Sequence, residues 1–142
     1  MTLAEQRRQG GDASGVRIEA WRDEVVEAHG HHPRSAYATR FWLPLVGPSS
    51  LVTAGWLADA LSAAPGGLHV DLVALGQALG LPGRAGGQAK IVRTIDRLAQ
   101  FGLVRLHPAS TPLLRVRLAW PPLTQRQLSR LPAFLVERHS AA

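Results

Sequence analysis

A group of side chains able to contact nucleic acid lies close together in the middle of the chain. All of them donate hydrogen bonds, as contacts to phosphates and base edges require: Gln88, Lys90, Arg93, Thr94 and Arg97. Among them, Ile91, Ile95 and Leu98 recur at i, i+4 and i+7 and form one apolar stripe. The segment therefore predicts an amphipathic helix over residues 87–101 that packs on a core while its other face presents donors to DNA.

The residues after this helix predict a short hairpin. Gly102 suits the left-handed position that ends a helix. Extended, partly β-branched runs follow at 103–105 and 114–118. The run HPASTP between them contains prolines and small polar residues, which favour a turn. Residues 103–118 are therefore expected to form two strands joined by a tip.

Three further elements are predicted before the helix. Asp71 is suited to cap a helix over residues 72–79, which carries an apolar stripe and is followed by a glycine. Another helix is expected over residues 49–63, opened by a proline and closed by a Pro-Gly-Gly run. Residues 68–70 can supply a strand to the sheet of the hairpin. The expected order is helix, strand, helix, helix, strand, strand.

With this order of elements, and with a glycine between the last helix and a hairpin, residues 48–120 resemble the winged helix-turn-helix family. The resemblance implies a mostly α fold with a small β wing, to which this chain adds N-terminal and C-terminal helices. It also implies that the helix at residues 87–101 reads the major groove of DNA while the wing at residues 103–118 meets the backbone.

The resemblance gives each donor an expected role. The positions that usually read base edges are Gln88, Ala89 and Arg93. The positions of the flanking phosphate contacts are Lys90, Thr94 and Arg97. The wing residues that would reach the backbone or the minor groove are Arg105, Arg115 and Arg117.

The connection before the recognition helix, residues 81–87, is longer than the usual turn of the family. It contains three glycines and Arg84. In one interpretation its backbone amides and Arg84 meet a phosphate at the helix N-terminus. In the other it is a solvated loop, since the lysine and hydroxyl residue of a phosphate-binding loop are missing. The sequence leaves both open.

Both ends of the chain lie outside this unit. Residues 1–15 are polar and without periodicity, which predicts a disordered tail. Residues 16–47 are predicted as a helical extension; the beginning, 16–28, also alternates like a strand, and a helix is favoured. Residues 121–142 predict a C-terminal helix with a Thr-x-x-Gln capping signature. Its apolar residues are expected to hold a homodimer: Leu128, Leu131 and Leu135.

The composition of the chain limits the cellular compartment and the kinds of chemistry to be expected. The chain has 142 residues, one domain of ordinary size, and contains no cysteine, which excludes disulfides, thiolate zinc sites and cysteine nucleophiles. It has no apolar run of membrane-spanning length and its first residues lack the core of a signal peptide, so a cytoplasmic protein is expected.

Charge is distributed unevenly along the chain. Residues 1–27 contain six acids and four arginines, whereas residues 28–136 contain eleven Lys and Arg against three acids. A basic region of this kind attracts nucleic acid regardless of sequence. Arginine supplies fifteen of the sixteen basic residues, however, a bias also expected of a GC-rich genome. Charge alone therefore does not identify the partner.

Catalytic patterns are weak. His29, His31 and His32 beside Glu27 are ligand types for zinc, but their spacing matches no standard site and a solvated loop is favoured. No serine lies in a GxSxG-like elbow. We expect neither an enzyme nor a cofactor. The four tryptophans are most simply packing residues, with a ligand pocket or a subunit contact as the alternative for two of them, Trp42 and Trp120.

Most of the chain also resembles small uncharacterised proteins of high-GC, actinobacterial-type bacteria, through the segment HPRSAYATRFWLPLVGPS, the winged-helix part and the closing PPLTQRQLSRLP. This resemblance implies no activity. Taken together, the patterns predict a DNA-binding, dimeric transcriptional regulator. They leave one alternative open, a winged helix that binds proteins and not DNA.

Overall fold

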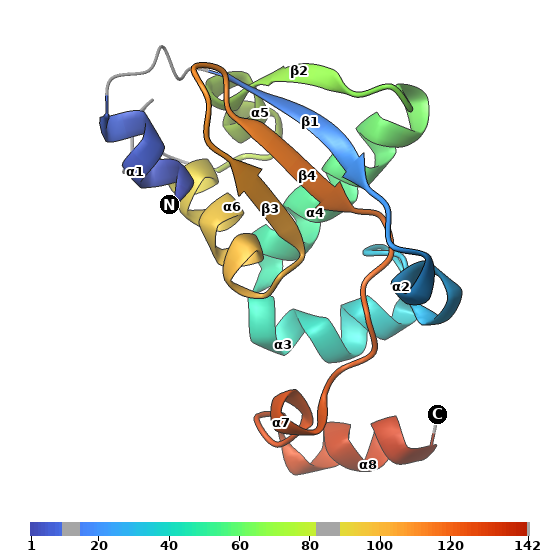
Figure 1. The fold of residues 1–142 in the computed structure, drawn as a ribbon. Helices are drawn as coiled ribbons and strands as arrows, with labels where there is room; N and C mark the ends of the chain where they lie inside the picture. The colour runs from blue at the N-terminus through green and yellow to red at the C-terminus, as the bar shows by residue number, and fades with distance from the viewer. Residues whose placement is uncertain (10–14, 82–88, 142) are drawn as a thin grey trace.

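The computed structural model describes residues 1–9, 15–81 and 89–141. Its centre is a four-stranded sheet in the order β2-β1-β4-β3. Three helices, α4, α5 and α6, pack behind this sheet (Figure 1). The strands are β1 (Gly15–Trp21), β2 (Leu68–Asp71), β3 (Val104–His107) and β4 (Leu113–Arg117). The molecule is thus mixed α/β, with a larger sheet than the small wing that the sequence predicts.

Strand β1 corrects the helix favoured at residues 16–28. Val16 and Ile18 are almost fully buried against the helices, so their alternation is that of a strand with one buried face. The strand pairs in parallel with β4 and antiparallel with β2, and lies between them. β2, expected beside the hairpin, therefore pairs with β1 instead. A helix, α2 (Glu24–His29), begins only after Asp23, which caps it.

From α4 onward the elements follow the expected order. The helices are α4 (Pro48–Ala63), α5 (Leu72–Ala78) and α6 (Lys90–Gln100), and β3 and β4 form the hairpin. Asp71 caps α5 as predicted, because its side chain accepts a hydrogen bond from the N–H of Ala74 at 2.9 Å. Gly102 has a φ of 70°, the left-handed conformation expected after α6.

The N-terminal segment differs from the disordered tail that the sequence predicts. Residues Leu3–Arg8 form helix α1, which packs on α6 (Figure 1). The side chain of Leu3 is only 1% exposed, so its burial favours the ordered helix. The local sequence is polar around this one leucine, which is why composition alone suggests disorder.

Residues 30–47 contain short helical elements: a π-helix, η1 (Ala38–Trp42), continues into α3 (Leu43–Val46). Trp42 contributes to the core, where its ring meets Trp120 edge to face at 5.5 Å between centroids. Its indole N–H donates to the carbonyl of Pro121 at 3.0 Å. Both rings are 1% exposed, which confirms the packing role expected of them.

The C-terminal region forms two helices, α7 (Gln125–Leu128) and α8 (Ala133–Ala141), divided at Pro132. Thr124 and Gln127 form the predicted capping box. The three leucines expected to hold a dimer pack within the chain instead, because Leu131 is buried and the other two, Leu128 and Leu135, are half-buried against the core. Within the described ranges, no helix is both long and apolar enough to cross a membrane.

Candidate nucleic-acid interface

The face of α6 that points away from the core is cationic. Residues with long polar side chains recur along it at the spacing of successive turns: Lys90, Arg93, Arg97 and Gln100. Arg93, Arg97 and Gln100 are exposed, and Lys90 is half-buried. The helix presents this face because its other residues pack against α4, α5 and β3.

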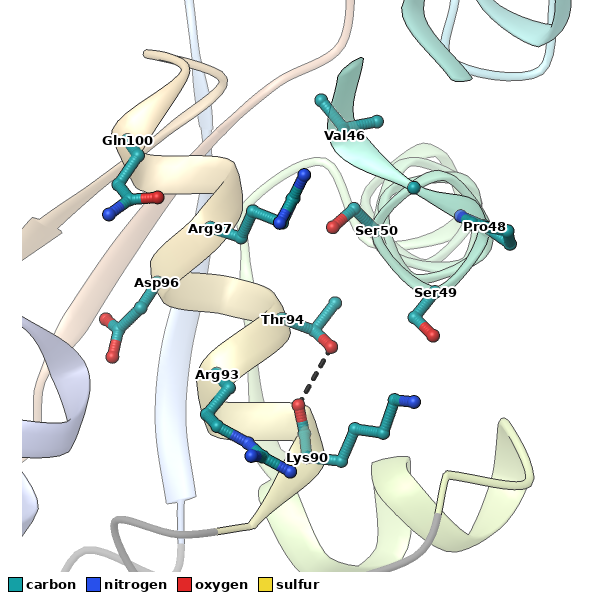
Figure 2. A pocket seen from close by; sticks show the side chains of 11 residues that line it. Val46, Pro48, Ser49, Ser50, Lys90, Arg93, Thr94, Asp96, Arg97 and Gln100 are labelled. Carbon is teal, nitrogen blue, oxygen red and sulfur yellow. Dashed lines mark hydrogen bonds between the residues drawn. The ribbon is translucent and has the colours of Figure 1, made fainter. Parts of the chain in front are cut away.

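A pocket of about 600 Å³ lies between this face and the beginning of α4. Figure 2 shows how its side chains are arranged. Lys90 extends toward Ser49 at one end of the pocket, and the guanidinium of Arg97 lies toward Ser50 at the other end (Figure 2). The side chain of Arg93 extends along α6 toward the N-terminal end of that helix (Figure 2). The pocket therefore joins two cations of α6 to the N-terminus of a second helix.

Asp96 is the only acid of α6, and it does not face α4. Its carboxylate points to the other side of the helix (Figure 2), where it accepts hydrogen bonds from the backbone N–H groups of Leu3 and Ala4. These N–H groups belong to the first turn of α1, which lacks its own intrahelical acceptors. The acid is thus used to hold α1, and the α4 side of α6 presents donors.

Arg97 is partly fixed. One of its guanidinium nitrogens donates to the carbonyl of Leu45 at 2.8 Å, and the guanidinium carbon lies 6.0 Å from the ring centroid of Phe101. A guanidinium has five N–H donors, so most of them remain for another acceptor.

Two residues assigned to DNA by the sequence are buried. Thr94 is 6% exposed, and its hydroxyl donates to the carbonyl of Lys90 in the previous turn. Ala89 is also 6% exposed and precedes the first residue of the helix. The apolar stripe of α6 is wider than predicted, because Val92 and Thr94 pack inward beside the three expected residues. Gln88 and Arg84 lie outside the described residues.

The wing arginines lie on a different surface from the α6 cations. Arg105, Arg115 and Arg117 project from the outer face of the sheet, since they alternate with buried residues that face the helices. The guanidinium carbons of Arg105 and Arg117 lie 4.4 and 3.6 Å from the ring centroid of Trp21. The arrangement therefore does not bring these arginines to the pocket.

Arg117 has a structural role. Its side chain is 14% exposed. It donates to the carbonyl of Gly102 at 2.9 Å and to the carboxylate of Asp23 at 3.4 Å. A hydrogen bond from the N–H of Val26 and, to a smaller extent, the contact with Arg117 lower the pKa of Asp23. These contacts connect the end of α6, the hairpin and the cap of α2.

The histidines near residue 30 do not form a metal site. His31 stacks on Tyr37 at 3.8 Å between ring centroids, and Nδ1 of His32 accepts a hydrogen bond from the N–H of Arg34. Within the described part of the chain, no group of three or more His, Asp or Glu side chains could hold a metal ion.

Sequence reasoning missed Ser49 and Ser50 as site residues. The helix start that the sequence predicts at Pro48 and Ser49 is the signal that points to them, because a helix N-terminus carries free N–H groups. Only the packing of α4 on α6 brings it beside Lys90 and Arg97.

No protein-family model, curated protein or solved structure matches this chain.

Proposed function

We propose that this protein binds double-stranded DNA through the exposed face of α6 and acts as a transcriptional regulator, with residues 48–120 as a winged helix-turn-helix unit. The observation that carries the proposal is the position of Asp96. Because its carboxylate is bonded to α1, the opposite side of α6 carries the cations Lys90 and Arg97 and no free acid. A helix of this kind fits the major groove, where bases and phosphates supply acceptors.

Within this interface Arg93 is the residue for base contact. It is exposed, and none of the described residues forms a hydrogen bond or an ion pair with it. Arginine can bond a guanine through two parallel contacts, O6 and N7. Lys90 and Arg97, which flank it, are assigned to the phosphate backbone.

The interface leaves out the wing arginines. Two of them, Arg105 and Arg117, are stacked on Trp21, and all three face away from the helices. Their assignment to the same duplex as α6 therefore has no support in the geometry.

We also propose a homodimer, because one winged helix contacts too few base pairs to specify a site. The leucines expected to hold it are used within the chain. Phe134 of α8, in contrast, is 68% exposed, and it is the large apolar side chain that this helix leaves open to a second copy.

Salt-dependent binding tests the DNA proposal. Fluorescence anisotropy of a labelled mixture of duplexes should show affinity that falls steeply between about 50 and 200 mM salt. Arg130→Ala serves as a matched control, since Arg130 is an exposed arginine outside α6. Arg93→Ala should weaken binding to a selected DNA site, whereas Arg130→Ala should retain most of the parent's affinity for the same site. No binding at low salt would contradict the proposal and favour the protein-binding module.

A further inference from the structure

We infer that the pocket between α4 and α6 binds a phosphate group, held by the N-terminus of α4, the hydroxyl of Ser50 and the cations Lys90 and Arg97. The assignment of that phosphate to the DNA backbone rests on the proposed function. A phosphate-bearing small molecule has the same chemistry, and the experiment below separates the two sources.

The first turn of α4 has backbone donors without acceptors. Gly47 precedes the helix and has no side chain to cap it, and Pro48 has no N–H. The first N–H of this turn that is bonded to the backbone is that of Leu51, which donates to the carbonyl of Gly47. The N–H groups of Ser49 and Ser50 thus remain for a ligand, at the positive end of a 16-residue helix.

The hydroxyl of Ser50 is an independent indication of a ligand. The Ser50 residue is 2% exposed and lines the pocket, and its hydroxyl oxygen is not among the fully buried polar atoms that lack a partner in the described residues. Figure 2 shows the hydroxyl on the side of α4 that faces Arg97 and Thr94, so it points into the pocket. A hydroxyl at the wall of the pocket can donate a hydrogen bond to an acceptor held there.

The charges around this hydroxyl select an anion. Lys90 closes one end of the pocket and Arg97 the other (Figure 2). The carbonyl of Leu45 holds Arg97 in place, so its guanidinium is already oriented before a ligand arrives. Asp96, the acid among the lining residues, is bonded to α1.

The arrangement of donors favours a phosphate over a carboxylate. Two N–H groups and a hydroxyl approach from α4, and an ammonium and a guanidinium approach from α6. These donors surround the pocket from several directions, which suits a tetrahedral group with several acceptor oxygens better than a planar one. The pocket is also open and wide enough for the phosphate to belong to a longer chain.

Titration of the ¹⁵N-labelled protein with inorganic phosphate, against chloride at equal ionic strength, tests the pocket by itself. We expect saturable shifts of the amide signals of Ser49, Ser50 and Leu51. Ser50→Ala and Lys90→Gln should each weaken the saturation several-fold. Ser62→Ala should not, because Ser62 is exposed at the other end of the same helix. Shifts that do not saturate, or that persist unchanged in both pocket variants, would overturn the inference.

A second arm uses a short DNA duplex in place of inorganic phosphate. Ser50→Ala should reduce DNA affinity about tenfold relative to Ser62→Ala, since it removes one hydrogen bond to a charged group. If inorganic phosphate binds but Ser50→Ala leaves DNA affinity unchanged, the pocket stands and its DNA assignment is wrong. If Arg93→Ala weakens DNA binding, but inorganic phosphate gives no saturable shifts and Ser50→Ala leaves DNA affinity unchanged, the inference is wrong and the proposed function stands.

Discussion

The carboxylate of Asp96 joins α6 to the first turn of α1 through Leu3, whose backbone N–H donates to it at 2.6 Å. The N–H of Ala4 donates to the second carboxylate oxygen at 3.1 Å. The same contact has two consequences. It anchors a helix that composition does not predict, and it turns the carboxylate of the only acid of α6 toward α1, on the side of the helix opposite α4.

Asp96→Ala should release α1 and lower the free energy of unfolding by about 1 to 2 kcal/mol, the range for loss of a helix-capping side chain. Urea denaturation measures this change, and amide exchange of residues 3–8 should accelerate with it. Asp59→Ala is the control, because Asp59 is 59% exposed in a surface ion pair with Arg34. Equal stability of the two variants would show that the Asp96 contact does not hold α1.

Arg117→Ala should destabilise the protein by about 1 to 3 kcal/mol, because it removes hydrogen bonds to Gly102 and Asp23 and the stacking on Trp21. Arg115→Ala removes the same charge from an exposed neighbour on the same strand and should change stability by less than about 0.5 kcal/mol. Thermal unfolding compares the two. Similar melting temperatures would contradict the structural role of Arg117.

Arg93→Ala should leave folding nearly unchanged, since the side chain is exposed. In the proposed complex it should cost about 1 to 3 kcal/mol on a preferred DNA site and much less on random DNA. Arg93→Lys should restore little of this discrimination, because an ammonium does not form the paired contacts of a guanidinium. Binding of either variant as tight as that of the parent, on the preferred duplex, would exclude a base contact.

Stability should fall as the pH drops below about 6.5, the ordinary histidine value. Burial, and then the charge of His139, lower the pKa of His31, so the folded state binds a proton there less readily than the unfolded state. The loss of stability begins near the pKa of histidine in the unfolded chain and is complete below the lowered pKa of His31 in the folded protein. Urea midpoints between pH 8 and pH 5 measure it. His31→Phe keeps an aromatic ring against Tyr37 and should flatten the dependence; an unchanged slope would exclude His31 as its source.

Phe134→Ser should weaken self-association without lowering monomer stability, because Phe134 is exposed on α8. Leu131→Ala should instead destabilise the monomer by about 2 to 5 kcal/mol, since Leu131 is part of the core. Sedimentation velocity at micromolar concentration separates the two effects. A parent protein that remains monomeric with and without DNA would contradict the proposed dimer.

Local signals in the sequence determined the order of elements from α4 to β4. Proline at the start of α4, the Asp71 cap of α5 and the left-handed Gly102 after α6 each act within a few residues of the boundary that they specify. The Thr124 capping box belongs to the same class. Such features are recognisable in a linear sequence because the interacting groups are neighbours in it.

Tertiary structure decided the features that depend on distant partners. Residues 16–21 carry spacings compatible with a helix and with a strand, and pairing with β2 and β4, far along the chain, selects the strand. The burial of Thr94 and the partners of Arg117 likewise follow from packing between elements. The pocket arises in the same way: its serines and its cations lie some forty residues apart in sequence, and only the contact of α4 with α6 makes them neighbours.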